Sequence, residues 1–334
     1  MTPGVYITVD VECSMGGAWR NPSLRPVPPA RAMMGEYGNQ QLGLPLIADI
    51  LCGNGVAGTF FVEAFTEEQG FQGQTEGVCQ YLLDRGQDVQ LHIHPNHKHF
   101  ALHQKGLPYT FTDDMADLSA EQQTALLAEG CQRLARWTGV APVAFRAGNM
   151  AASEAVLPQV SAAGLRIDSS YCFPFAGGQC RFRPEEPYNG TKWYGDVLEL
   201  ALSGFYQPPW PGLKPARPLD VVGTSFEECR DGIIRICQGG AEAVVILHSF
   251  SLFKVRSVQY DGGRLNRIVA RRFRRLCEWL AEHKDEFPAR TCRQLAEAIG
   301  RGQYTAKAVT PCRLSGSRAL VRSAVQAVNR YYWA

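Results

Sequence analysis

The sequence of 334 residues lacks several features that would assign it to a common class of protein. No stretch approaches the roughly 18 consecutive apolar residues that a membrane-spanning helix needs. Residues 1–4 lead into an apolar strand with no basic segment and apolar core before it, so we expect no secretory signal peptide. The 11 cysteines are odd in number and include no Cys-x-x-Cys pair, which disfavours a disulfide framework and a cysteine-based zinc site. We therefore expect a protein of the reducing cytoplasm.

Charge is small in total but uneven along the chain. The net charge is +2 and the isoelectric point is about 8.0. Of the 34 basic and 32 acidic residues, six basic and no acidic ones follow residue 300, so the first 300 residues carry a net charge of −4. This weakly basic balance, without a zinc finger or a base-stacking motif, gives no support to nucleic-acid binding.

Strand and helix signals alternate along the chain, which predicts an α/β fold with a parallel sheet or barrel. Expected strands are the apolar runs at 5–9, 58–62, 88–91, 143–145, 165–167, 198–200 and 243–247. Helical patterns lie at 41–51, 76–83, 119–137, 154–163, 225–237 and 265–282. We expect residues 1–300 to form one catalytic barrel and residues 301–334 to form a basic, helical C-terminal extension. Long loops are expected at 19–37, 173–195 and 207–218, where they would line a substrate cleft.

Reactive side chains gather where the expected strands end. Five of the seven histidines fall between positions 92 and 103, directly after the apolar run at 88–91, and two acids end the first strand. Parallel strands place their carboxyl ends at one edge, where β/α barrels form active sites, so we expect these side chains to meet. The residues with this placement are Asp10, Glu12, His92, His94, Arg146, Asp168 and His248. Two acids and a histidine cluster at such an edge indicate a metal site.

Five short motifs occur in an order that resembles a known family. They are Thr8-Val9-Asp10-Val11-Glu12, Leu91-His92-Ile93-His94-Pro95, Phe145-Arg146-Ala147-Gly148-Asn149, Asp168-Ser169-Ser170 and Ile246-Leu247-His248-Ser249. Across about residues 4–300 the chain resembles the polysaccharide deacetylases of the NodB-homology type, carbohydrate esterase family 4. It is most similar to their cytoplasmic WalW-like branch, which is associated with lipopolysaccharide biosynthesis. The resemblance implies a distorted (β/α)7 barrel that uses a divalent metal to hydrolyse an acyl bond on a sugar.

The resemblance implies that Glu12, His92 and His94 bind the metal, although two family motifs are altered here. The usual pair of aspartates is Asp10-Val11-Glu12, so the glutamate becomes the ligand acid. The usual histidine pair encloses three residues, whereas His92 and His94 enclose one and His92 and His97 enclose four. His94 is favoured because Pro95 follows it, and His97 stays open as the alternative. Such ligands accept Zn²⁺, which we expect first, and also Co²⁺, Ni²⁺ or Mn²⁺.

The resemblance also implies the acid and base of the reaction. Asp10 would be the general base, held ionised and oriented by Arg146. His248 would be the general acid, and Asp168 would hold it in the reactive tautomer. A third departure from the family lies at Gly148-Asn149, where the usual Pro-Tyr and its aromatic wall are missing.

These residues predict a metal-dependent hydrolase that removes an N-acyl group, acetyl in the first instance. The expected substrate is an acylated sugar, a nucleotide sugar or a lipid-linked saccharide, with ring-stacking aromatics such as Trp193 and Trp210 in the long loops. Two alternatives remain open: hydrolysis of a non-sugar amide or ureide on the same scaffold, and a non-catalytic carbohydrate-binding protein.

Two basic segments allow a second kind of contact. Six arginines lie between positions 264 and 275, and residues 317–334 alternate apolar residues with arginines. The first segment suits a solvated helix face or a surface for anionic groups. The second suits a helix docked on the barrel or one that lies peripherally on the inner face of a membrane.

Overall fold

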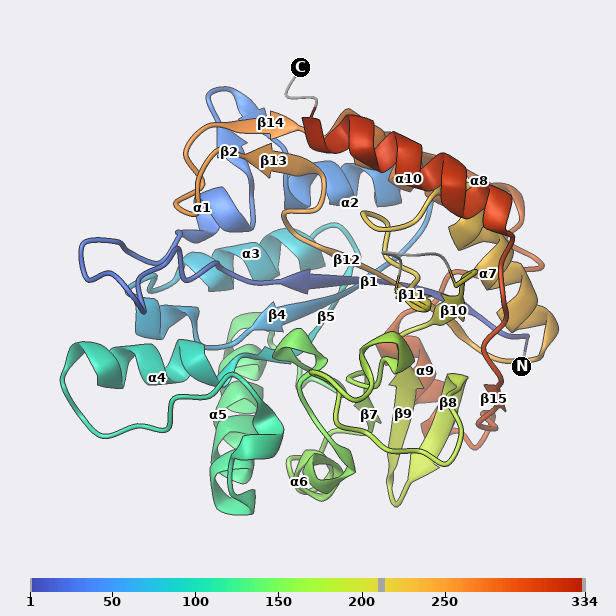
Figure 1. Ribbon diagram of the computed structural model, residues 1–334. Coiled ribbons are helices and arrows are strands. Elements are labelled where there is room, and N and C mark those ends of the chain that lie inside the picture. The colour runs from blue at the N-terminus through green and yellow to red at the C-terminus, as the bar shows by residue number, and fades with distance from the viewer. Residues whose placement is uncertain (1, 210–213, 332–334) are drawn as a thin grey trace.

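A curved, mostly parallel sheet forms the centre of the computed structural model, which describes residues 2–209 and 214–331 (Figure 1). Within these ranges, seven parallel strands lie in the order β12-β1-β4-β5-β6-β7-β9, and antiparallel β8 and β15 follow β9. The bounds are β1 Val5–Val11, β4 Thr59–Glu63, β5 Asp88–Ile93, β6 Ala144–Ala147, β7 Ile167–Asp168, β8 Asn189–Tyr194, β9 Val197–Ala201, β12 Ala243–His248 and β15 Ala308–Val309. Every residue of β1 is buried, as expected for a strand covered on both faces of a parallel sheet.

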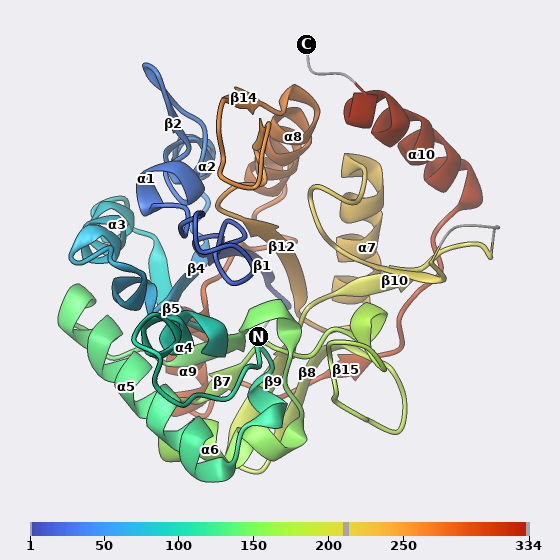
Figure 2. The ribbon, with the colours of Figure 1, turned by 60° about the vertical axis from the view of Figure 1, so that its left-hand side comes forward.

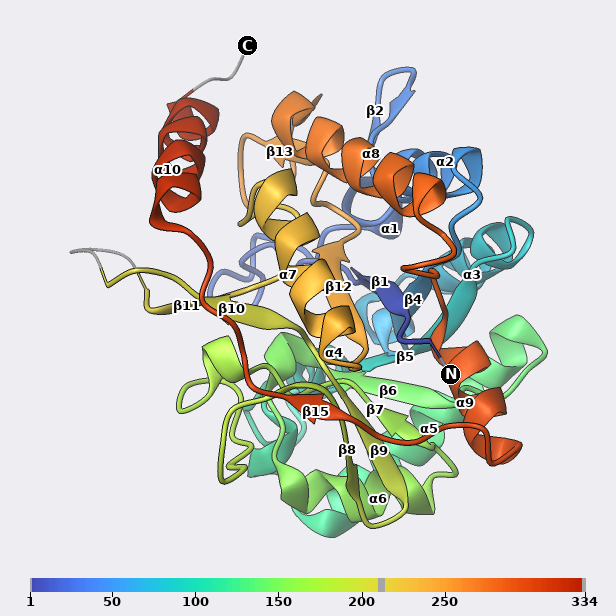
Figure 3. The ribbon, with the colours of Figure 1, turned by 90° about the vertical axis from the view of Figure 1, so that its right-hand side faces the viewer.

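Helices surround the outside of the sheet (Figure 2). Capping boxes fix the first turns of α5, α7 and α9, whose N-cap residues are Ser119, Ser225 and Thr291. The helices are α1 Pro29–Ala32, α2 Leu44–Gly53, α3 Gln74–Leu83, α4 Pro95–Gln104, α5 Ala120–Thr138, α6 Leu157–Ala162, α7 Phe226–Gln238, α8 Arg267–Glu282, α9 Cys292–Gly300 and α10 Gly316–Tyr331. Beyond residue 300 the chain adds β15 to the sheet and then runs into α10 (Figure 3).

The sheet closes on itself through irregular backbone rather than through a further strand. The amide of Val244 in β12 donates to Ser203 Oγ at 2.9 Å, and the amide of Ser203 donates to the Val244 carbonyl at 3.2 Å. Further along, the Ile246 amide donates to the Leu219 carbonyl at 2.9 Å, and the Val221 amide donates to the Ile246 carbonyl at 3.2 Å. The predicted distorted β/α barrel is therefore confirmed, and this seam is its distortion.

Several short elements differ from the sequence prediction. The histidine run continues as α4 instead of a loop, because Pro95 at the first helical position presets the helical backbone although no apolar periodicity marks the helix. The expected loop at 173–195 contains β8, and that at 19–37 contains α1. Three small hairpins complete the fold: β2 Glu36–Tyr37 with β3 Gln40–Gln41, β10 Gly204–Tyr206 with β11 Ala216–Pro218, and β13 Phe253–Val255 with β14 Gly263–Leu265. No helix in the described ranges is both long and apolar enough to cross a membrane.

A buried acid at the amino end of the barrel makes stability depend on pH. Glu242 is 5% exposed and accepts a hydrogen bond from the Gly4 amide at 2.5 Å. Burial outweighs that bond and the nearby Arg290, and raises the pKa of Glu242 to about 7. The folded protein therefore holds this proton more tightly than the unfolded chain does, so stability falls as the pH rises from about 4.5 to about 7.

Glu242→Gln is expected to remove that pH dependence, because the amide oxygen still accepts from Gly4 but carries no charge. Compared with the wild type, the variant gains up to roughly 3 kcal/mol of unfolding free energy between about pH 5 and about pH 8.5. Urea unfolding at both pH values measures the difference. The exposed Glu286→Gln is the control and should shift neither value. Equal pH dependence in the wild type and Glu242→Gln would show that Glu242 is ionised without cost.

Candidate metal centre and acid–base site

Five of the sequence-predicted site residues lie at the carboxyl edge of the sheet, to which β1 and β4 point in Figure 1. Asp10 stands in register with His248 of β12, and His92 stands in register with Arg146 of β6. Glu12 follows the last residue of β1. Neighbouring parallel strands that end together thus bring an acid pair, a histidine and an arginine to one edge.

Glu12, His92 and His94 form a cluster that could hold a metal ion. Their ligand atoms all lie within 4.8 Å of one another. Glu12 Oε2 is 2.5 Å from His94 Nε2 and 3.3 Å from His92 Nε2. Both histidines are buried, and the Glu12 side chain is 16% exposed, so the cluster is reached from one side.

The donor chemistry of this cluster fits a divalent cation. His92 Nδ1 is 2.9 Å from the Arg146 carbonyl, which can only accept, so the imidazole proton sits on Nδ1. His94 Nδ1 is 2.8 Å from Asp113 Oδ2 and is fixed in the same way. In the neutral tautomers, both Nε2 atoms therefore present lone pairs to the Glu12 carboxylate. Three lone pairs that face one another need a cation between them, and metal-binding histidines are usually oriented by such Nδ1 acceptors.

The charges and hydrogen bonds within the cluster shift the pKa values of Glu12 and His94 in opposite directions. Burial alone would raise the pKa of Glu12, but His94 and hydrogen bonds from both histidines outweigh it and hold the pKa well below its usual range. Burial alone would lower the pKa of His94, yet Asp113 and Glu12 raise it well above its usual range. A metal ion would therefore displace a proton from His94, as expected of ligands that must be deprotonated to bind.

A second set of residues, which sequence reasoning missed, holds His94 in place. Asp113 accepts from the Asn149 side chain at 2.8 Å as well as from His94. Glu63, at the end of β4, is fully buried and accepts from the backbone amide of His94 at 2.6 Å. Burial raises the pKa of Glu63 to about 7. Asp113 lies 19 residues beyond His94 and follows no strand, so only the position of Glu63 at a strand end was visible in the sequence.

Gly148 explains the altered motif after Arg146. A Cβ atom at this position would overlap the imidazole ring of His94. The glycine therefore allows β6 and its following turn to pass directly against the second histidine, while the next residue, Asn149, holds Asp113 with its backbone at a φ of 55°. The polysaccharide deacetylases that the sequence resembles are expected to have an aromatic side chain at this position. Here Gly148 and Asn149 instead make room for His94 and hold Asp113, which orients it.

Gly148→Ala is expected to weaken metal binding without unfolding the barrel. The added methyl group displaces the His94 ring, and losses of orienting contacts around metal ligands typically cost roughly 10- to 100-fold in metal affinity. Competition between the protein and a chromogenic chelator for Zn²⁺ measures the change. Gly77→Ala is the matched control, because a Cβ there meets nothing within 4 Å and alanine favours the helix α3. Equal affinity of the two variants would show that the His94 ring is not confined by Gly148.

His97 is placed differently from the other two histidines. Its ring stacks on that of His94 with centroids 5.0 Å apart, and its Nδ1 lies 3.7 Å from Glu63 Oε2. Burial, followed by the neighbouring His94, lowers the pKa of His97 to about 3. His97 is thus a neutral packing partner of His94 in this structure, and the atoms that converge are those of Glu12, His92 and His94.

Asp10 and Arg146 form a buried ion pair beside the cluster. Arg146 NH1 donates to Asp10 Oδ1 at 2.6 Å and to Thr8 Oγ1 at 3.0 Å. Its other nitrogens donate to the carbonyl and the hydroxyl of Ser169, and the guanidinium lies 4.2 Å above the ring of Phe61. Asp10 is 1% exposed and Arg146 is fully buried. The arginine is therefore immobilised, and it holds the Asp10 carboxylate in one orientation.

His248 stands at the open side of the site, and its acidic neighbour is not the predicted one. The His248 side chain is 36% exposed, and its Nε2 lies 4.0 Å from Glu12 Oε1. A second carboxylate, Asp220 on the closing seam beside β12, is close enough for the charge of His248 to offset part of the rise that burial causes in the pKa of Asp220. Asp220 is itself oriented by the Val222 and Gly223 amides at 2.9 and 3.1 Å.

Asp168 was predicted to orient His248, and the structure places it elsewhere. Both of its oxygens accept from Ser170, from the amide at 3.1 Å and from the hydroxyl at 2.8 Å. The Ser170 hydroxyl also accepts from the Ala147 amide at 3.0 Å. Burial raises the pKa of Asp168, and burial together with the charge of Asp168 raises the pKa of Glu199. Asp168 therefore supports the segment Ser169–Ser170, which accepts hydrogen bonds from Arg146, and its own hydrogen bonds do not involve His248.

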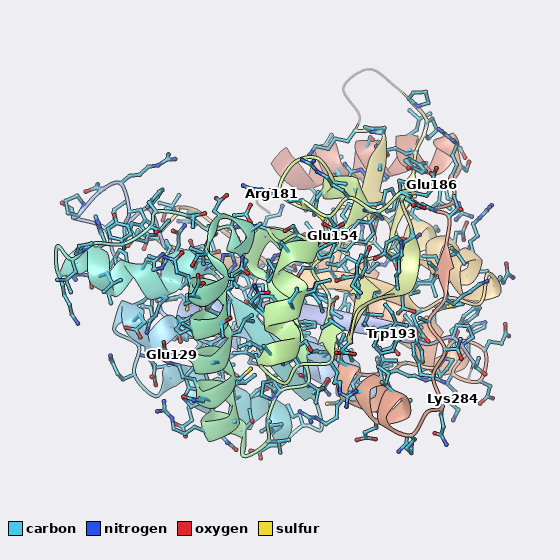
Figure 4. The ribbon with its side chains drawn as sticks, turned by 90° about the horizontal axis from the view of Figure 1, so that it is seen from below. Glu129, Glu154, Arg181, Glu186, Trp193 and Lys284 are labelled. Atoms are coloured by element: carbon cyan, nitrogen blue, oxygen red, sulfur yellow. The ribbon has the colours of Figure 1, made fainter. Side chains whose placement is uncertain are left out.

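Aromatic rings gather in two clusters, and the predicted loop at 173–195 contributes to one of them. In that cluster the ring centroids of Tyr171 and Tyr188 are 4.5 Å apart, and those of Phe182 and Tyr194 are 6.2 Å apart. Trp19 contacts a ring cluster from α4 and the loop after it, with centroid distances of 4.9 to 5.7 Å to Phe100, His103, Tyr109 and Phe111. Phe111 is 65% exposed and lies two residues before Asp113. Trp193, expected in the cleft, lies on β8 at the face seen from below in Figure 4, and Trp210 lies outside the described residues.

Comparisons with known proteins bear on the fold. A Mycobacterium smegmatis protein provisionally named a polysaccharide deacetylase aligns over 94% of this chain and 95% of its own, with a TM-score of 0.54 and 16% identity. The chain has the NodB-homology fold. The Puue allantoinase structure shares this fold over 90% of this chain and 92% of its own, with a TM-score of 0.50 and 14% identity. No family model and no curated protein sequence matches the chain.

Proposed function

We propose that the protein is a metal-dependent hydrolase of the polysaccharide-deacetylase family that removes an N-acyl group, acetyl in the first instance, from a sugar. The observation that carries this proposal is the convergence of three lone-pair donors beside a buried Asp10–Arg146 pair and a half-exposed histidine. Amide hydrolysis needs a base, an acid and an electrophile to activate the carbonyl, and this edge of the sheet supplies residues for each.

Glu12, His92 and His94 are the proposed metal ligands, with Zn²⁺ as the first candidate. A divalent ion held there would polarise the acyl carbonyl and lower the pKa of a water molecule. Asp113 and the Arg146 carbonyl keep both Nε2 atoms in the ligating tautomer. Glu63 fixes the backbone of His94 and so keeps that ring in position.

Asp10 is the proposed general base. Its Oδ1 is held by Arg146, which leaves Oδ2 to take the proton of the attacking water. The guanidinium prevents the carboxylate from turning away, so the base remains oriented when substrate binds. Thr8 and Ser169 fix the arginine in turn, and the base is therefore positioned by β1, β6 and the residue that follows β7.

His248 is the proposed general acid. It is the most exposed of the site histidines, and its ring is held against Phe250 with centroids 5.0 Å apart. Asp220 would stabilise the imidazolium before the proton passes to the departing amine, which is the role assigned to Asp168 from the sequence. Asp10 and His248 lie on adjacent strands in register, so the proposed base and acid stand at one edge of the sheet, where both can reach the same substrate.

The aromatic cluster around Trp19 supports a sugar as the substrate. Rings with exposed faces, such as Phe111, stack on the apolar faces of sugar rings, and this cluster is joined to the site through Asp113. Within the family we propose the WalW-like branch and a glycan precursor, either a nucleotide sugar or a lipid-linked saccharide. The eleven unpaired cysteines are compatible with a reducing compartment.

A ureide hydrolase is the second candidate, because the allantoinase fold covers the chain almost as completely as the deacetylase fold does. Both reactions use an activated water and an acid, so the metal site does not separate them. A non-catalytic sugar-binding protein is less well supported, since binding alone needs neither the Asp10–Arg146 pair nor His248.

One experiment separates the three candidates. Protein loaded with Zn²⁺ is assayed for acetate release from N-acetylhexosamines and nucleotide sugars and for loss of a cyclic ureide, and its metal content is measured. We expect about one metal ion per chain and acetate release, both lost in His92→Ala and both retained in His283→Ala, whose histidine lies on the Trp279 carbonyl far from the site. Ureide loss without acetate release would favour the second candidate. Sugar binding without turnover would overturn the proposed enzyme.

A further inference from the structure

The helix α10 presents its apolar side to solvent. Leu320, Val321 and Val328 are 56%, 65% and 56% exposed. Ala324 and Ala327 lie on the same side and are exposed as well. Positions spaced by three and four residues share one face of a helix, so these side chains form one continuous apolar stripe without a charged residue. A surface helix normally turns such a stripe inward, and this one does the opposite.

Polar contacts with the barrel fix α10 in this inverted orientation. Arg322 is 1% exposed, and its nitrogens donate to Glu228 Oε1 at 2.5 Å and to Gln207 Oε1 at 2.7 Å. Arg318 pairs with Asp231, and Gln326 donates to the Val222 carbonyl at 2.9 Å. The side of the helix that carries Arg318 and Arg322 therefore packs against the barrel. The apolar stripe faces outward because the buried ion pair leaves the helix no other way to pack.

A row of exposed arginines lies on α8, at the same end of the molecule as the stripe. Arg267, Arg271 and Arg274 are exposed and spaced by four and three residues, so they form one row along α8. On the inner side of α8, Arg272 donates to the same Val222 carbonyl that accepts from Gln326 of α10, so side chains of the two helices meet at one acceptor while α7 lies between the helices (Figure 3). Figures 1 to 3, related by rotations about the vertical axis, all show α8, α10 and the β13–β14 hairpin at the top of the molecule.

We infer that this surface, defined by Leu320, Val321 and Val328 with Arg267, Arg271 and Arg274 and here called the α8–α10 face, binds an anionic lipid bilayer. An apolar stripe flanked by arginines matches a membrane surface, where the side chains enter the headgroup boundary and the guanidinium groups meet phosphates.

Charge argues for a bilayer rather than for a second copy of the chain. A symmetric dimer through α10 would bring two identical rows of arginines together, and like charges repel. Glu227 offsets part of the charge through Arg275, while acidic Glu278 lies farther along α8. An anionic surface neutralises the row and covers the stripe at the same time.

The α8–α10 face adjoins the acid side of the site. The backbone of Asn329 accepts from Lys254 in β13, and β13 begins five residues after His248. If the proposed function holds, a membrane on this face lies next to the opening through which a lipid-linked saccharide would enter. Membrane binding itself does not depend on that function, and it is measured without turnover.

Co-sedimentation with vesicles of equimolar phosphatidylglycerol and phosphatidylcholine tests the inference. We expect the wild type to bind these vesicles and to bind pure phosphatidylcholine vesicles weakly. The triple variant Leu320→Glu/Val321→Glu/Val328→Glu should lose at least about tenfold in binding, since three charges would have to enter the apolar boundary. Val140→Glu, an equally exposed valine before β6 at the amino end of the sheet, is the matched control and should bind as the wild type does. Deleting α10 is a poorer test, because it would leave Glu228 buried without its arginine.

Arg271→Glu/Arg274→Glu tests the electrostatic half of the inference, with an expected loss of about fivefold or more per residue that shrinks as salt rises. Circular dichroism confirms that each variant is folded. No binding by the wild type, or equal binding by the triple variant and Val140→Glu, overturns the inference. Sedimentation velocity completes the design: a wild-type dimer that the triple variant breaks, without vesicle binding, would assign the stripe to a second copy of the chain instead.

Discussion

Asp10→Asn is expected to reduce hydrolysis roughly 10²- to 10⁴-fold while the metal remains bound. The asparagine oxygen can still accept from Arg146 NH1, so the pair keeps its geometry, but an amide cannot take a proton from water. None of the proposed ligand atoms belongs to Asp10. Steady-state acetate release and metal content of the same preparation measure the two parts of this prediction.

A second buried aspartate provides the control for this variant. Asp88 begins β5 at the opposite end of the barrel and accepts from Thr59 and Gln90. Asp88→Asn should lower stability but leave the turnover number unchanged, because it removes a similar buried charge away from the site. Activity of Asp10→Asn within tenfold of the wild type would remove Asp10 from the role of base. Loss of metal would instead show that Asp10 belongs to the ligand set.

The strand-end residues were predictable from the sequence because a parallel sheet imposes their meeting. Asp10, His92, Arg146 and His248 each lie in or directly after a short apolar run, and runs of this kind become neighbouring strands whose carboxyl ends coincide. No long-range contact needs to be known for that inference. The alternation of strands and helices predicts a parallel barrel, and a parallel barrel brings the residues at the strand ends together.

Residues that reach the site from irregular segments could not be predicted in this way. Asp113 depends on the path of the chain after α4, and α4 itself has no apolar periodicity to announce it. Asp220 lies on an irregular segment that bonds to β12 at the closing seam, whereas Asp168, which was predicted for this role, ends a short strand. Gly148 is informative only once the His94 ring is known to lie against it. Each of these roles is set by tertiary contacts that leave no periodic signal.

The orientation of α10 shows a further limit of pattern reasoning. Periodicity identifies the two faces of the helix 316–331 but does not say which one packs inward, and the usual expectation is the apolar face. In this helix the Arg322–Glu228 ion pair determines which face packs inward. Glu228 is fully buried, and its Oε2 accepts from the Ser225 amide at 2.9 Å as part of the capping box of α7. Its Oε1 is left for Arg322, so the arginine has to face the barrel.

Arg322→Met is therefore expected to lower the unfolding free energy by about 3 to 5 kcal/mol, the cost of leaving one member of a buried ion pair uncompensated. Methionine fills most of the arginine's volume, so the loss reports charge rather than a cavity. Urea unfolding at neutral pH measures it. The double variant Arg322→Met/Glu228→Gln should recover most of the loss, because glutamine carries no charge and its oxygen can still accept from the Ser225 amide.

Exchange of the α10 amides with solvent separates two explanations if Arg322→Met has only a small effect on the unfolding free energy. If Arg322→Met alone costs less than about 1 kcal/mol, α10 is detaching so that water reaches Glu228, and exchange of the α10 amides with solvent will then be fast. If the α10 amides stay protected from exchange and the loss of unfolding free energy is still small, the Arg322–Glu228 pair does not hold α10 in place. The outward orientation of the apolar stripe would then need another explanation. A large loss in the single variant that is recovered in the double variant leaves the buried charge as the reason that α10 turns Leu320, Val321 and Val328 toward solvent.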